Sequence, residues 1–186
     1  MCSAFAIYWP CTLVTGTTGE GLDLTNSKRG KVWLAVSGLV IDEKGRWLVV
    51  KKRYGGLKGK WSLPAGFVDE NETADEAVLR EVFEETGVRA RVKGLIGLRT
   101  GVINHEISDN MLLFSLAPSE GSDEVSVQEK ELFEVRWMQP QELLANPDAS
   151  VIIHKLIQDD RGSSIEMIEG INPGNQFGYT AYKLFL

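Results

Sequence analysis

The chain has 186 residues and a formal net charge of −6, with 43% hydrophobic and 25% charged residues. These proportions indicate a globular domain with a sizeable core and exclude a disordered or fibrous chain. The acidic balance also argues against a protein that holds long nucleic acid, because no global basic field would attract the phosphates.

The N-terminal segment differs from the rest of the chain. It begins MCSAFAIYWPCTLVTG, which is apolar but carries no basic residue, and Pro10 interrupts it. A secretory signal needs a positive start and a membrane span needs about 20 apolar residues, so we expect neither. Cys2 and Cys11 fit no metal-binding spacing and indicate a reducing, cytoplasmic setting. We expect residues 1–30 to form an extension, as strand or loop, before a main domain at 31–186.

Two apolar segments open the main domain. KVWLAVSGLVI (31–41) is typical of a largely buried strand, and RWLVVKKR (46–53) of a second strand after the turn DEKG. Because the turn is short, we expect these two strands to pair as a hairpin. YGGLKGKWSLPAGF (54–67) is rich in glycine and predicts a loop.

The most helical stretch follows this loop. Thr73 and Glu76 have the spacing of a capping box, which places the start of a helix at Thr73. Gly87 stands where a helix end favours a left-handed residue. We therefore predict a helix over 74–86. The apolar positions expected on its buried side are Val78, Leu79, Val82 and Phe83.

The second half of the chain mixes strands and short helices. We expect strands over 88–102, 111–118, 133–138 and 177–186, and helices over 140–146 and 150–160. Strands mixed with a few helices predict a layered α/β or α+β domain.

Three glutamates lie close together on the predicted helix. At 3.6 residues per turn, Glu81, Glu84 and Glu85 fall within an arc of about 100°. Like charges at this spacing repel, and covering them raises the cost. Arg80 can offset part of the repulsion by pairing with Glu84 or Glu76. A bound cation is the other compensation, and oxygen ligands without sulfur or imidazole suit Mg²⁺ or Mn²⁺. The plain alternative is an acidic helix face in water.

The spacing around these glutamates is the feature that favours a site. GFVDENETADEAVLREVFEETGV (66–88) fits G-x5-E-x7-R-E-U-x-E-E-x-G-U at every position, where U is aliphatic. This pattern resembles the signature of the Nudix family, and the likeness covers roughly residues 31–159. It implies an α/β/α sandwich with a mixed β-sheet.

The resemblance also implies a reaction. Nudix proteins hydrolyse the pyrophosphate bond of a nucleoside diphosphate linked to another moiety, with a divalent metal such as Mg²⁺ or Mn²⁺. By position, Glu81, Glu84 and Glu85 resemble the metal ligands, and Arg80 the arginine that orients a glutamate of the motif. The resemblance further assigns catalysis to Arg80, Glu84 and Glu85, structural roles to Glu72 and Gly87, and close backbone approach to a ligand to Gly66.

Family members often add a glutamate from outside the motif, as a metal ligand or general base. Glu131, just before the predicted strand 133–138, resembles that residue, and Glu129 is the second candidate. The alternative for both is a solvated acidic loop.

The segment KKRYGGLKGKW (51–61) is locally basic. Arg53 is our candidate for substrate binding through phosphate, and Lys60 is a weaker one. Tyr54 or Trp61 could stack on a base. For every residue here except Arg53, the sequence favours the plain alternative of a soluble hairpin tip with a core tryptophan.

Two other functions fit the same family. One is a nucleotide-binding regulator without turnover, and such proteins often have incomplete motifs, whereas every glutamate is present here. The other is a prenyl diphosphate isomerase, whose additional cysteine and metal pattern is missing. We expect a small nucleotide-type diphosphate as the partner, no long nucleic acid and no membrane, and the sequence leaves a homodimer open.

Overall fold

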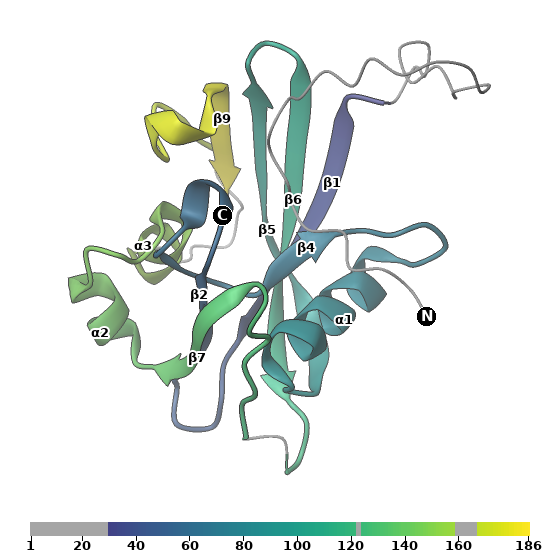
Figure 1. The fold of residues 1–186 in the computed structure, drawn as a ribbon, viewed down its shortest axis with the longest axis vertical. Helices are drawn as coiled ribbons and strands as arrows, with labels where there is room; N and C mark the ends of the chain where they lie inside the picture. The colour runs from purple at the N-terminus through teal and green to yellow at the C-terminus, as the bar shows by residue number, and fades with distance from the viewer. Residues whose placement is uncertain (1–29, 122–123, 159–166) are drawn as a thin grey trace.

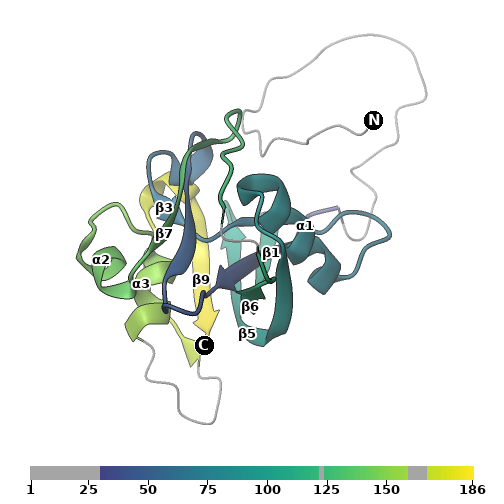
Figure 2. The same ribbon diagram turned by 90° about the horizontal axis from the view of Figure 1, so that it is seen from below.

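The computed structural model describes residues 30–121, 124–158 and 167–186. Two β-sheets occupy its centre, with helix α1 (Ala74–Thr86) on one side and helices α2 (Pro140–Ala145) and α3 (Val151–Gln158) on the other. Figure 2 shows these layers most clearly. The α/β/α sandwich predicted from the sequence is confirmed.

The larger sheet has six strands in the order β4-β1-β6-β5-β9-β8. Strands β1 and β6 are parallel and the other neighbours are antiparallel, so the sheet is mixed as expected. Figure 1 shows β1, β6 and β5 side by side. The bounds are β1 Val32–Val40, β4 Ala65–Phe67, β5 Ala90–Ile103, β6 Ile107–Pro118, β8 Met167–Ile168 and β9 Tyr179–Phe185.

The smaller sheet has the order β3-β2-β7, formed by Trp61–Ser62, Trp47–Lys52 and Leu132–Met138. The hairpin predicted for the first two strands is therefore wrong, because β1 and β2 belong to different sheets. Their backbones pair at a bridge between Ile41 and Trp47, beside a turn in which Asp42 accepts bonds from backbone N–H groups. Residues 35–40 of β1 and 47–50 of β2 are buried on both faces, which placement in two separate sheets makes possible.

Two hydrophobic clusters hold the layers together. One contains Leu39, Val49, Leu113 and Ile153 and lies on the side of α2 and α3. The other contains Val36, Val50, Leu116 and the α1 residues Val78 and Val82. Because alternate residues of each central strand enter different clusters, the sheets are packed on both faces, and α1 rests on the second cluster.

Helix α1 spans the predicted residues. Thr73 and Glu76 form the capping box, and Gly87 has φ of 72° and ends the helix. The prediction for Phe83 is wrong: its side chain is 44% exposed, and the guanidinium of Arg89 lies 4.7 Å from its ring centre. Val78 and Val82 face the sheet, and Phe83 lies about 100° further around the helix than Val82.

The predicted loop 54–67 holds more structure than expected, namely the 3₁₀ turn η2 (Gly55–Leu57), β3 and β4. The other predicted strands and helices are confirmed to within a few residues: β6 begins four residues before the expected start, and β5 begins at Ala90 and ends at Ile103. Near the C-terminus, the 3₁₀ turn η3 (Asn175–Phe177) precedes β9, which pairs with β5 inside the large sheet.

Both cysteines and the predicted extension, apart from its last residue Gly30, fall in residues 1–29, outside the described residues. No helix in the described segments has the length and apolar character to span a membrane.

Candidate active site

The signature places its residues on three adjoining pieces of structure. Gly66 lies in β4, Glu72 in the loop after it, and the glutamates on α1. A Cβ atom at Gly66 would lie 2.1 Å from the carboxylate of Glu81. Strand and helix therefore approach so closely here that only glycine leaves room for the Glu81 side chain.

Arg80 connects the loop to the helix. Its Nη2 and Nε donate to the two carboxylate oxygens of Glu72, at 2.7 and 3.0 Å. Its Nη1 donates to Glu81 at 2.7 Å and more weakly to Glu84 at 3.4 Å. Nη2 also reaches the carbonyl of Phe67 at 3.0 Å. The planar guanidinium thus fixes the position of Glu81 against β4.

The pairing of Arg80 resolves an alternative that the helical spacing left open. Arg80 contacts Glu84, whereas the carboxylate of Glu76 accepts bonds from the backbone and hydroxyl of Thr73. Glu72 also accepts a bond from the backbone of Asp69 at 2.7 Å. The cap and the Glu72 contacts together define how the loop enters the helix.

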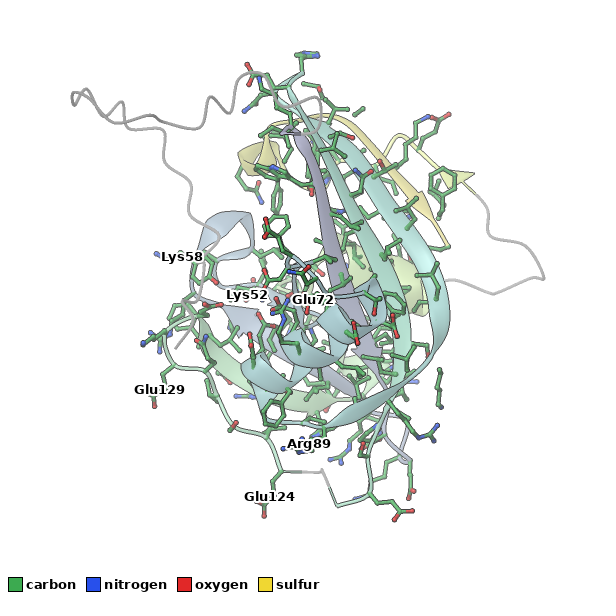
Figure 3. All side chains as sticks on the ribbon, turned by 90° about the vertical axis from the view of Figure 1, so that its right-hand side faces the viewer. Lys52, Lys58, Glu72, Arg89, Glu124 and Glu129 are labelled. Atoms are coloured by element: carbon green, nitrogen blue, oxygen red, sulfur yellow. The ribbon has the colours of Figure 1, made fainter. Side chains whose placement is uncertain are left out.

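Lys52 was not a candidate from the sequence, yet it lies at the centre of the site (Figure 3). Its ammonium group donates to the carboxylate of Glu85, and the two side chains are 9% and 4% exposed. The other oxygen of Glu85 accepts from the backbone of Ala65 at 3.3 Å. Strand alternation could have revealed Lys52, because it has the same parity as the buried Leu48 and Val50.

The electrostatics of α1 follow from this burial. Burial raises the pKa of Glu81 to about 7, although Arg80 opposes the rise and Glu85 adds to it. Burial also raises the pKa of Glu85, against the opposing charge of Lys52. Glu84 differs from both, since its side chain is 57% exposed.

These carboxylates fit the ligand chemistry of a hard divalent cation. In the described parts of the chain, no three acidic, histidine or cysteine side chains stand close enough as a group to hold an ion directly. Lys52 and Arg80 occupy the carboxylates of Glu85 and Glu81 instead. Two buried anions with raised pKa values nevertheless gain from additional positive charge, which supports a cation at this position.

Glu131 belongs to the same region. The hydroxyl of Tyr54 donates to its carboxylate at 2.7 Å, and the charge of Glu131 acts on Glu85. Glu129, the second candidate, is exposed and points outward at the edge of the molecule in Figure 3. The structure thus brings Glu131, but not Glu129, to the α1 glutamates.

Arg53, Lys60 and Trp61 of the basic segment 51–61 each make different contacts. Arg53 is exposed, donates to the carbonyl of Leu132 at 2.6 Å and lies over the ring of Phe133. Lys60 pairs with Asp148 at 2.9 Å. Trp61 is 4% exposed and belongs to a hydrophobic cluster, which matches the plain alternative of a core tryptophan.

Comparisons with known proteins place most of the chain in one family. The model of the NUDIX domain matches residues 31–159. A MutT-like protein of Streptomyces ambofaciens is 34% identical over 110 residues, which are 59% of this chain and 66% of that protein. An ADP-ribose pyrophosphatase of Methanocaldococcus jannaschii is 43% identical over 65 residues, or 35% and 38% of the two chains.

Solved structures show the same fold. A NUDIX hydrolase of Nitrosomonas europaea has a TM-score of 0.55 and 26% identity, over 69% of this chain and 71% of that one. The MutT protein of Methanosarcina mazei Go1 has a TM-score of 0.58 and 24% identity, over 68% and 91% of the two chains. The match spans 31% to 66% of the length of the first three curated relatives. With its signature complete and most of its length matched, the chain belongs to the NUDIX family.

Proposed function

We propose that this protein is a metal-dependent hydrolase that cleaves the pyrophosphate bond of a nucleoside diphosphate linked to another moiety. The observation that carries the proposal is that Glu85 is buried and Glu81 is largely covered on one helix, with its side chain 15% exposed beside Gly66 and Arg80. A solvated acidic face, the plain alternative, would leave all three glutamates exposed, whereas only Glu84 is.

In this proposal, each residue of the site has a separate role. Glu81, Glu84, Glu85 and Glu131 would supply the oxygen ligands for Mg²⁺ or Mn²⁺. The bound ion would neutralise the diphosphate oxygens and lower the pKa of a water molecule for attack on phosphorus. Arg80 keeps Glu81 against β4, and Glu131 can accept the proton of the attacking water. Gly66 leaves open the space that Glu81 needs.

Arg53 remains our candidate for binding substrate phosphate. Its Nε donates to the carbonyl of Leu132, and its guanidinium lies over the ring of Phe133, two residues after Glu131. These contacts orient the positively charged guanidinium of Arg53, which supports a role in binding phosphate at the rim of the site. The pairing of β9 with β5 supports a single domain over 31–186, because the C-terminal strand completes the large sheet.

The names of relatives narrow the substrate only to a class. Two relatives are named for ADP-ribose pyrophosphatase and NAD-capped RNA hydrolase activity, and each name describes that protein. Both substrates contain a nucleoside diphosphate linked to a further group. We therefore propose a small nucleotide-type diphosphate as the substrate. We also propose that the protein acts in the cytoplasm, because its two cysteines suit a reducing setting.

The test is hydrolysis of a substrate panel with Mg²⁺ and with Mn²⁺, measured as release of phosphate or mononucleotide. Glu84→Gln is the sharpest variant, because the side chain is exposed and its loss should remove most turnover without unfolding the protein. Asp75→Asn is the matched control, since Asp75 is an exposed carboxylate on the same helix. Tight nucleotide binding without turnover of any substrate would instead identify a nucleotide-binding regulator.

A further inference from the structure

Glu131 is held in place by two separate sets of contacts. Its backbone is fixed, because its carbonyl accepts from Arg53 at 2.8 Å and its N–H donates to the side chain of Gln128 at 2.9 Å. Its carboxylate is held by the hydroxyl of Tyr54 at 2.7 Å. The direction of the carboxylate therefore depends on a residue 77 positions away in the chain.

Tyr54 stands among the carboxylates of the site. Its side chain is half-buried, and burial raises the pKa of its phenol well above the usual range. The charges of Glu131, Glu85 and Glu81 raise it further. The phenol hydroxyl is the donor in its bond to Glu131, because the carboxylate can only accept.

The loop that carries Tyr54 is itself supported by the C-terminal segment, which the family match does not include. A Cβ atom at Gly56 would lie 2.2 Å from the ring of Phe177, so the ring packs directly on this glycine. Gln176 donates to the carbonyl of Gly56 at 3.3 Å. The C-terminal segment thus restricts the loop two residues from Tyr54.

We infer that Tyr54 is a positioning residue that holds the carboxylate of Glu131 toward the α1 glutamates during hydrolysis. The inference rests on the proposed function, in which Glu131 is a ligand or base. A free glutamate side chain populates several rotamers, and only some of them point at Glu85. The phenol selects one of them before the substrate arrives.

This role differs from stacking on a base, which the sequence left open for Tyr54. Stacking depends on the ring, whereas positioning depends on the hydroxyl. Tyr54→Phe keeps the ring and removes only the hydroxyl, so it separates the two roles. We expect kcat to fall about tenfold, because one hydrogen bond to a charged group is lost. KM should stay within about twofold, because the ring and its contacts remain.

A double-mutant cycle with Glu131→Gln tests the dependence on Glu131. Tyr54→Phe should have less than about a twofold effect in the Glu131→Gln background. The same tenfold loss in both backgrounds, or a Tyr54→Phe variant as active as the wild type, would overturn the inference. Tyr182→Phe is the control, because it removes a phenol hydroxyl from β9 in the hydrophobic cluster and should leave kcat unchanged.

Crystal structures of the wild type and of Tyr54→Phe provide a readout without turnover. The inference expects the Glu131 carboxylate to leave its position in the variant while the backbone stays. A carboxylate that keeps its position would overturn it. A wild-type enzyme that cleaves no substrate refutes the proposed function, whereas this structural comparison still decides whether Tyr54 orients Glu131.

Discussion

Lys52 and Glu85 form an ion pair inside the protein, joining the end of β2 to the last turn of α1. Both side chains are at least nine-tenths buried, at 9% and 4% exposure. A buried ion pair adds little net stability when complete, but removal of one partner leaves a charge without compensation. The pair therefore ties the stability of the fold to the charge on the candidate metal ligand.

Replacement of Lys52 by methionine tests this relation. We expect Lys52→Met to lower the free energy of unfolding by about 3 kcal/mol, because Glu85 becomes an isolated buried carboxylate. Urea denaturation in the presence of EDTA measures the change. Lys52→Met combined with Glu85→Gln should recover a large part of the loss, and a double variant as unstable as the single one would contradict the explanation.

Lys60 offers a matched control for that experiment. It pairs with Asp148 at 2.9 Å, but the two side chains are 40% and 48% exposed. Exposed ion pairs contribute about 0 to 1 kcal/mol. Lys60→Met should therefore cost less than about 1 kcal/mol in the same assay.

Arg80→Lys tests the need for a planar guanidinium. Arg80 contacts Glu72 through two nitrogens, and Glu81 through a third. A single ammonium cannot reproduce this set, so we expect at least about a tenfold loss of turnover. Arg136→Lys is the control, because Arg136 lies on the surface and pairs with Glu134. Equal activities of the two variants would show that Arg80 acts only through its charge.

Gly66→Ala separates folding from function. The added methyl group would lie 2.1 Å from the carboxylate of Glu81, which can swing away because it is the end of a flexible side chain. We expect turnover to fall at least about tenfold while the thermal midpoint changes by only a few degrees. Gly94→Ala should change neither, since nothing lies within 4 Å of its added Cβ atom. Normal turnover by Gly66→Ala would show that the position of Glu81 is not critical.

The parts of the fold that depend on local signals were predictable from the sequence. The capping box at Thr73 and the glycine at 87 give both ends of α1, because caps are chosen by neighbouring residues. The assignment of β1 and β2 to separate sheets was not predictable, since it depends on partners far along the chain. Strand β1 pairs with β6, and β2 with β7.

The same distinction applies to the site. The family motif located Glu81, Glu84 and Glu85 by their spacing along one helix. Lys52 and Tyr54 reach the site only through folding, since their partners Glu85 and Glu131 are 33 and 77 residues away. Spacing along a helix carries information over a few residues, whereas contacts between sheets and helices require the tertiary structure.

Glu81 gives the metal-free protein a characteristic dependence on pH. Its pKa is raised from 4.5 to about 7 by burial, so between these values the folded state binds a proton that the unfolded chain releases. The free energy of unfolding contributed by this group is therefore greatest below pH 4.5 and is lost as the pH rises through 7. We expect the free energy of unfolding to fall by about 2–3 kcal/mol between pH 5 and pH 7.5 in EDTA, measured by urea denaturation.

Glu81→Gln should remove this part of the pH dependence, because glutamine stays neutral. Mn²⁺ should bind more tightly as the pH rises over the same range, because the ion competes with the proton. Identical pH profiles for the wild type and Glu81→Gln would place the pKa of Glu81 near that of an ordinary glutamate.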